Sequence, residues 1–294
     1  MPAIVLIDTD PAIGIPARDV YDALAIMYLL ALEDAFEVAG ITPVHGNASL
    51  AKTARAAHDV LLVAGRQDVP VRPGAAGKRD LGKPSPASRL LIETVLTLPG
   101  EVTVLAIGPL TNVATAMILD PELASRVGRL VVMGGSLDAG MGIQLLSPLE
   151  FNFLADTRAA EAVLAARCEK VVITSYLCQQ VVFGRRELEA LQEMGSYQAS
   201  WLARRIEPWL RLNNVAPLLP WRVGFVPWDV IAAVYLQRPD LFEEEETCLR
   251  LRPARPMTGA IERCEGDAPC RLPVQVRSDE LLDEFLDAIA QFEP

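Results

Sequence analysis

Short apolar runs alternate with segments of helical periodicity along most of the chain. The runs are rich in β-branched residues, as strands buried on both faces are, and they occupy residues 3–7, 36–44, 102–107, 129–133 and 170–173. Apolar residues at helical spacing occupy residues 20–31, 49–64, 110–118 and 157–166. This alternation predicts an α/β fold with an open mixed, mostly parallel sheet flanked by crossover helices.

The rest of the chain extends the same pattern without a visible boundary. Residues 230–236 are predicted to form a buried helix, residues 272–277 a late strand, and residues 278–292 an amphipathic closing helix. No internal repeat or low-complexity linker occurs, and 294 residues with 51% hydrophobic content suffice for one large core. We therefore expect a single domain over residues 1–294, in which the Gly- and Pro-containing loops at 74–86 and 136–148 are candidates for function.

Four aspartates lie within the first 22 residues: Asp8, Asp10, Asp19 and Asp22. The first strand delivers Asp8 and Asp10 to its carboxyl end, where open α/β sheets bind ligands, and the next helix begins near the other two, which would share one face. Such acids can simply cap a helix, but four uncompensated carboxylates this close are costly without a cation. Because all the ligands are oxygens, Ca²⁺ or Mg²⁺ is favoured over zinc.

The charge and composition of the chain limit the classes of molecule that the protein can be expected to bind. The net charge of −11 and the lack of a Lys/Arg-rich run argue against nucleic acid, so partners should be small and neutral or cationic. Only two histidines occur, too few for a histidine zinc site or relay, and five cysteines without close pairing favour free thiols in a reducing cytoplasm. With no signal-like segment and no apolar run of membrane-spanning length, we expect a soluble cytoplasmic protein that does not bind membranes.

Six short motifs occur in an order that resembles the inosine-uridine-preferring nucleoside hydrolase family over nearly the whole chain. They are Asp8-Thr9-Asp10-Pro11, His45-Gly46-Asn47, the run at 106–112 that ends in Gly108-Pro109-Leu110-Thr111-Asn112, Val132-Met133-Gly134-Gly135, Glu150-Phe151-Asn152 and Trp228-Asp229. The resemblance implies a metal-dependent hydrolase that cleaves the N-glycosidic bond of ribonucleosides. It also implies a homodimer or homotetramer.

The resemblance assigns roles to individual residues. In the family one Ca²⁺ holds the ribose diol and the attacking water, and an aspartate ligand takes the proton of that water. Carried over to this chain, the carboxylates of Asp10, Asp22 and Asp229 and the backbone carbonyl of Thr111 would bind Ca²⁺, with Mg²⁺ as the alternative ion, and Asp10 would be the general base. Asp8 would support these ligands without binding the ion itself. The ribose hydroxyls would be bound by Asn47, Glu150 and Asn152.

Two departures from the family pattern affect the sugar side. Tyr21 stands where the first acid of a pair is expected, after an inserted stretch at residues 13–18. Either the Tyr21 hydroxyl contacts the substrate, or Asp19 replaces the missing carboxylate. Gln144 stands where the family has an asparagine that contacts the 5′ side of the ribose.

A third departure concerns the leaving base. Trp228 occupies the position at which many members have a histidine that protonates the base. A purine-preferring branch also has tryptophan there and stacks the base between aromatic rings, so the resemblance implies a purine preference. The ring on the other side of the base could come from Trp201, Trp209 or Trp221. Trp228 and these three tryptophans could equally be core side chains.

Two other hypotheses remain open. The departures at Tyr21, Gln144 and Trp228 also fit a weak or inactive relative that binds Ca²⁺ and a ribosyl compound. Alternatively, Asp8-Thr9-Asp10 after a buried strand resembles the nucleophile motif of haloacid-dehalogenase-like phosphatases, against which Ala12 and the lack of a downstream acidic pair count.

Overall fold

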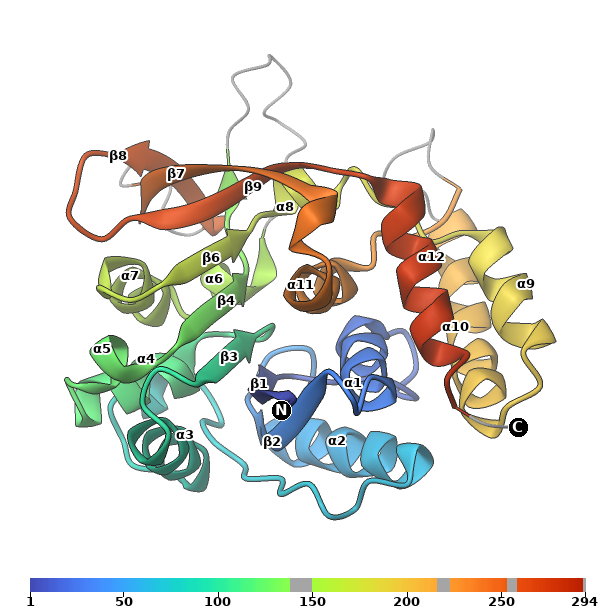
Figure 1. Cartoon of the computed structure of the whole chain (residues 1–294), viewed down its shortest axis with the longest axis horizontal. Helices are drawn as coiled ribbons and strands as arrows, with labels where there is room; N and C mark the ends of the chain where they lie inside the picture. Colours follow the sequence, from blue (N-terminus) through green and yellow to red (C-terminus); the bar gives the residue numbers. More distant parts are fainter. Residues whose placement is uncertain (138–149, 216–222, 253–257, 293–294) are drawn as a thin grey trace.

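The predicted apolar runs form the parallel part of the sheet. In the computed structural model, which describes residues 1–137, 150–215, 223–252 and 258–292, they are β1 (Ala3–Thr9), β2 (Phe36–Pro43), β3 (Val102–Ala106), β4 (Arg129–Met133) and β6 (Lys170–Ile173) (Figure 1). These strands pair in parallel in the order β2-β1-β3-β4-β6. Each prediction from the sequence is confirmed to within two residues at either end.

The sheet continues beyond β6 with strands of mixed direction. The late strand β9 (Cys270–Val276) runs parallel to β6, and β7 (Phe242–Leu251) and β8 (Ala260–Cys264) follow as antiparallel neighbours. The two-residue strand β5 (Ser136–Leu137) pairs in parallel with β8 at the far edge. The open mixed, mostly parallel sheet is therefore confirmed, and its β7, β8 and β5 part was not predicted.

Side chains alternate between two apolar cores, one on each face of the sheet. Along β1, Val5 and Ile7 enter one core, whereas Leu6 between them enters the other. The first core lies under α1 (Tyr21–Ala31), α2 (Leu50–Ala64), α11 (Trp228–Gln237) and α12 (Ser278–Ile289). The second lies under α3 (Pro86–Thr97), α4 (Thr111–Leu119), α5 (Leu123–Arg126) and α7 (Thr157–Ala165). Burial on both faces explains why the central strands are continuously apolar.

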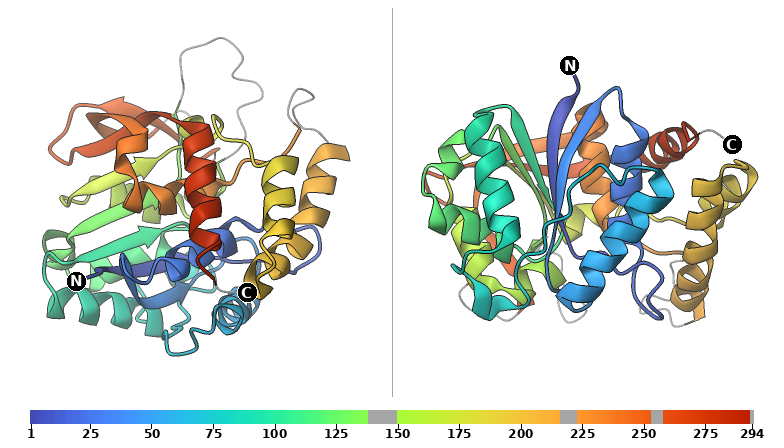
Figure 2. Two further views of the ribbon diagram at one scale, coloured as in Figure 1. Left: turned by 45° about the vertical axis from the view of Figure 1, so that its right-hand side comes forward. Right: turned by 90° about the horizontal axis from the view of Figure 1, so that it is seen from below.

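Two helices that the sequence did not predict lie outside the first layer. They are α9 (Arg185–Glu193) and α10 (Tyr197–Val215), which pack together beside α12 (Figure 2). Two shorter helices, α6 (Phe151–Ala155) and α8 (Ser175–Cys178), and the 3₁₀ turns at Lys78–Asp80 and Pro239–Leu241 complete the described part of the chain. None of the described helices is both long and apolar enough to cross a membrane.

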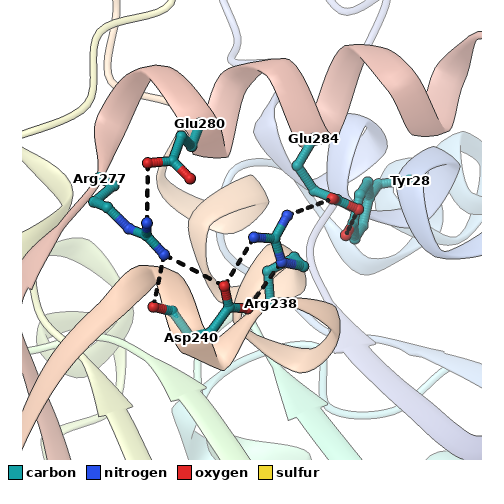
Figure 3. Close-up of polar contacts among 6 residues, drawn as sticks. All are labelled: Tyr28, Arg238, Asp240, Arg277, Glu280 and Glu284. Carbon is teal, nitrogen blue, oxygen red and sulfur yellow. Dashed lines mark hydrogen bonds and ion pairs between the residues drawn. The ribbon is translucent and has the colours of Figure 1, made fainter.

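The closing helix α12 is tied to the body of the protein by a polar network (Figure 3). The carboxylate of Glu284 accepts a hydrogen bond from the buried Tyr28 hydroxyl at 3.1 Å and pairs with Arg238 at 3.2 Å. Arg238 also pairs with Asp240, which in turn pairs with Arg277 at the start of α12. Glu284 is less exposed than Asp240 and Glu280, so we expect it to contribute most to stability.

We expect Glu284→Ala to lower the free energy of unfolding by about 1–3 kcal/mol, because it leaves the buried Tyr28 hydroxyl without its acceptor. Glu284→Gln keeps an acceptor oxygen and should lose less. Glu280→Ala removes an exposed pair with Arg277 and should cost about 0–1 kcal/mol. Urea unfolding followed by circular dichroism measures all three, and equal losses would show that the Tyr28 contact is not the important one.

Candidate active site

A cavity of about 180 Å³ opens where the parallel strands end. Its walls come from the segments that follow β1, β2, β3, β4 and β6 and from the starts of α6 and α11. The lining residues are Asp19, Tyr21, Asn47, Ile107, Met133, Glu150, Phe151, Asn152, Ser175, Trp228 and Asp229. Segments far apart in the sequence therefore meet at the edge of the sheet where α/β proteins bind ligands.

Asp10 lies just past the end of β1 and is buried behind Asn47, one of the residues that line the cavity. Its Oδ2 accepts a hydrogen bond from the Asn47 backbone N–H at 2.6 Å. Two glycines make room for the carboxylate: a Cβ at Gly46 would overlap Oδ2, and a Cβ at Gly108 would lie 2.9 Å from Oδ1. The glycines of two of the recognised motifs therefore serve to admit Asp10.

Asp22 fixes the turn that carries Asp10. Its Oδ1 accepts hydrogen bonds from the Thr9 hydroxyl at 2.5 Å and from the Asp10 backbone N–H at 2.9 Å. Its Oδ2 accepts one from the Asn47 side chain at 3.4 Å. Asp22 lies in the first turn of α1, whereas Asp19 precedes that helix, so the prediction that Asp19 and Asp22 share a helix face is wrong. They are brought together by the bend before α1 instead.

The buried acids raise one another's pKa. Burial is the main cause of the raised pKa of Asp10, Asp19 and Asp229, and the negative charge of Asp22 is the next largest cause for each. Arg18 acts in the opposite direction on Asp19. Among the described residues that line the cavity there is no lysine, arginine or histidine. Repulsion of this kind is relieved by protons or by a bound cation.

The donors fit a hard divalent cation in charge and in chemistry. They are carboxylate oxygens, and Oδ1 of Asp19 is buried without a hydrogen-bond partner in the described part of the chain. Within that part, no three Asp, Glu, His or Cys side chains already surround a common point closely enough to hold an ion. Backbone oxygen and substrate hydroxyls would therefore have to complete the coordination of any ion bound here.

The family resemblance assigns the backbone carbonyl of Thr111 to the metal. Thr111 is the first residue of α4. Its hydroxyl donates to Asp156 Oδ2 at 2.8 Å and lies 3.2 Å from His45 Nε2. Burial lowers the pKa of His45, which is not among the lining residues. These side-chain contacts fix the start of α4 at the end of β3, close to the aspartates.

Asp8 is fully buried and does not line the cavity. Its Oδ1 accepts hydrogen bonds from the Thr42 hydroxyl at 2.6 Å and the Asn112 side chain at 2.8 Å, and burial raises its pKa to about 7. The residue links β1 to β2 and α4.

Glu150 and Asn152 lie on the opposite wall and are both buried. The Glu150 carboxylate caps α6 by accepting from the backbone N–H groups of Asn152 and Phe153, each at 2.8 Å, and burial raises its pKa. The Asn152 amide donates to the carbonyls of Ile107 at 3.0 Å and Met133 at 3.1 Å. Asn152 thus bridges the ends of β3 and β4 and is more than a local cap. Gln144 lies outside the described residues.

Aromatic side chains form the remaining wall. Trp228 is half-buried at the start of α11, directly before Asp229. The Tyr21 hydroxyl accepts a hydrogen bond from Trp209 Nε1 at 3.0 Å, and the two rings meet edge to face with centroids 5.9 Å apart. Trp209 therefore lies behind Tyr21. Neither it nor Trp201, which is 5% exposed in the core, lines the cavity as an opposing ring.

Trp221, the third candidate for the opposing ring, lies outside the described residues. Several residues that line the cavity were not predicted from the sequence. The unpredicted residues are Ile107, Met133, Phe151 and Ser175. Ser175 follows the carboxyl end of β6, so the rule that placed Asp10 could have found it as well. Phe151 stands between Glu150 and Asn152 in a recognised motif, but only the structure shows that its ring reaches the cavity.

Solved structures define the class of fold. The chain superposes on a plant nucleoside hydrolase, PpNRh1, with a TM-score of 0.86 and 23% identity, covering all of both chains. It also superposes on a purine-preferring ribonucleoside hydrolase from Gardnerella vaginalis with a TM-score of 0.85 and 20% identity, covering 98% of each chain. The protein therefore has the nucleoside hydrolase fold.

Sequence comparison gives the family. Residues 5–281 match the model of the inosine-uridine preferring nucleoside hydrolase family. The chain is 30% identical over 275 residues to a probable uridine nucleosidase 2 of Arabidopsis thaliana, covering 84% of this chain and 81% of that protein. It is 29% identical to the pyrimidine-specific ribonucleoside hydrolase RihA of Citrobacter koseri, covering 82% of this chain and 81% of that protein. The chain belongs to this family and is an enzyme of the nucleoside hydrolase class, which leaves the phosphatase hypothesis without support.

Proposed function

We propose that the protein hydrolyses the N-glycosidic bond of ribonucleosides with Asp10 as general base and a divalent cation, Ca²⁺, as cofactor. The observation that carries this proposal is the group of mutually repelling buried acids next to a cavity lined by hydrogen-bonding side chains. Asp10, Asp22 and Asp229, with the Thr111 carbonyl, would hold the cation. When bound, the cation supplies charge compensation and Lewis acidity toward water and the ribose diol.

The reaction needs one proton acceptor and stabilisation of a cationic sugar. Asp10 takes a proton from water as the water oxygen bonds to C1′, while the C1′–N bond breaks and its electron pair leaves with the base. One Asp10 oxygen is already oriented by the Asn47 backbone N–H, so the carboxylate is held in place before substrate arrives. Neighbouring carboxylates favour positive charge on the ribosyl ring in the transition state.

The ribose would be bound by the polar residues that line the cavity. Asn47, Glu150 and Asn152 are proposed to bind its hydroxyls, and Gln144 remains a further candidate. Of the two alternatives at the altered position, Asp19 is the better carboxylate substitute. Its Oδ1 is buried without a hydrogen-bond partner among the described residues, whereas the Tyr21 hydroxyl already accepts a bond from Trp209. Tyr21 would then act as an aromatic wall.

We propose a purine preference, with Trp228 stacking on the leaving base. Support comes from the aromatic lining and from the lack of a histidine among the lining residues. A pyrimidine preference is the second candidate, since relatives in Arabidopsis thaliana and Citrobacter koseri are named as a probable uridine nucleosidase and a pyrimidine-specific hydrolase. Comparing kcat/KM for inosine and adenosine with that for uridine and cytidine decides between them. Tight binding of all four without turnover would instead indicate the inactive ribosyl-binding relative.

We expect chelation to abolish turnover and Ca²⁺ to restore it. Because Ca²⁺ would bind the folded acids and not the unfolded chain, an excess of about 100 times its Kd should raise the free energy of unfolding by about 2.7 kcal/mol. Thermal unfolding with chelator, with Ca²⁺ and with Mg²⁺ measures this, and Asp229→Asn should reduce the Ca²⁺-dependent shift. Full activity in protein shown by elemental analysis to be free of metal would refute the cofactor.

A further inference from the structure

A second cavity lies beside the first, between the inserted segment after β1 and helix α10, which run next to each other (Figure 2). Its volume is about 520 Å³, and three arginines contribute to its lining: Arg18, Arg204 and Arg205. The described lining residues include no aspartate or glutamate, although the chain carries a net charge of −11. We call this the arginine cavity.

The arginines of this cavity have no ion-pair partner in the described part of the chain. Arg205 lies 3.8 Å from the centroid of the Trp201 ring and donates to the Trp201 carbonyl at 3.3 Å, so its position is fixed by packing. Burial and the neighbouring charge of Arg204 both lower the pKa of Arg205. Asp59, which acts in the other direction, lies 4.0 Å from Arg55.

We propose that the arginine cavity binds a phosphoryl anion. Guanidinium groups bind phosphate oxygens through charge-assisted and often bidentate hydrogen bonds, and three of them around one cavity can compensate a dianion. The cavity is also lined by Ile15, Trp209 and Leu212, which leave an apolar wall for the organic part of a phosphorylated compound. Free phosphate and the phosphate of a nucleoside monophosphate share this chemistry.

The arginine cavity and the catalytic cavity share a wall. Along the segment before α1, Arg18 and Val20 line the arginine cavity, whereas Asp19 and Tyr21 line the catalytic one. Trp209 belongs to the arginine cavity and donates its Nε1–H to the Tyr21 hydroxyl. An anion held between Arg18 and α10 would bind next to Trp209, which contacts Tyr21, and to the residue that directly precedes Asp19. Occupancy of one cavity should change the nucleoside affinity of the other, and the reverse.

The test is a calorimetric titration of the intact protein with inorganic phosphate at constant ionic strength, with tryptophan fluorescence as a second readout from Trp201 and Trp209. Arg18→Gln/Arg204→Gln should weaken phosphate binding by at least about tenfold. The matched control is Arg89→Gln/Arg158→Gln, which removes two exposed arginines that form no ion pair in the described part of the chain and which should bind phosphate as the wild type does. Arg205 is left intact because it packs on Trp201.

The outcomes separate the proposal from nucleoside hydrolysis, because no readout depends on turnover. Lack of saturable binding in the millimolar range, or equal weakening in both double variants, would overturn the site. Titration with a nucleoside 5′-monophosphate shows the source of the anion: tighter binding than inorganic phosphate, lost in Arg18→Gln/Arg204→Gln, indicates a nucleotide. Phosphate that binds without changing the affinity for a nucleoside would overturn the coupling between the cavities.

Discussion

Asp10→Asn is expected to reduce turnover of the best nucleoside by several orders of magnitude while the fold stays intact. Loss of the general base alone accounts for about 10²–10⁴-fold, and the amide is also a poorer metal ligand. The fold should survive because an asparagine oxygen can still accept the Asn47 backbone N–H, and because the amide is no larger than the carboxylate that Gly46 and Gly108 accommodate. Steady-state kinetics and circular dichroism of the same preparation measure both effects.

Asp8→Asn is the matched control for this variant. It changes a neighbouring buried carboxylate to an amide but keeps an acceptor for Thr42 and Asn112, which bind Asp8, whereas Asp10 binds the cavity-lining Asn47. Its loss of activity should be much smaller. Near-normal turnover in Asp10→Asn would exclude Asp10 as the base. Equal losses in both variants would mean that the end of β1 is sensitive to any change.

Asp10→Asn should also stabilise the protein in the absence of metal. Asp10 raises the pKa of Asp229, and Asp22 raises that of Asp10, so removing one negative charge relieves repulsion in the folded state. Urea unfolding in chelator should give a higher free energy of unfolding for Asp10→Asn than for the wild type, and Ca²⁺ should reverse the order.

The central sheet was predictable because its strands are buried on both faces. Each of them is a short run of β-branched residues that alternates between two apolar cores, so composition alone separates it from the flanking helices. Helix α3 carried a readable signal that was overlooked, namely Ser85 as the capping residue before Pro86 in the first turn.

Strand β7 could not be predicted in the same way. It opens with four consecutive glutamates after Phe242, a charge run that is typical of an exposed loop or helix. In the folded protein, Glu244 pairs with Arg271 of β9 and Glu245 pairs with Arg263 of β8. The strand therefore depends on cross-strand partners that are distant in sequence. The pattern of apolar and polar residues within the strand does not indicate these partners.

The site shows the same limit. Motif positions such as Asp10, Asn47 and Asn152 were found because they follow strand ends or stand in a recognised order. The roles of Tyr21 and Trp209 depend on α10 folding back against the start of α1, which no local pattern indicates. The raised pKa of Asp229 likewise depends on acids more than 200 positions away.

Trp228→Ala is expected to reduce turnover of purine nucleosides by one to two orders of magnitude. If Trp228 stacks on the base, its ring favours the electron-poor protonated base as the glycosidic bond breaks, an effect of up to about 2 kcal/mol when desolvated. A nitrophenyl riboside has a good leaving group that needs no such help, so its hydrolysis should be nearly unchanged. Steady-state kinetics on both substrates in parallel measures the difference.

Trp228→Phe is the control that separates the ring from its N–H. Burial raises the pKa of the Tyr21 hydroxyl and a hydrogen bond from the Trp228 side chain acts in the opposite direction, so removal of the indole could act through Tyr21, which itself lines the cavity. If stacking is the cause, Trp228→Phe retains most purine turnover, whereas if the hydrogen bond is the cause, it falls as far as Trp228→Ala. Equal losses on purine nucleoside and nitrophenyl riboside would mean that Trp228 only positions Asp229, its neighbour at the start of α11, and stacking would have to be abandoned.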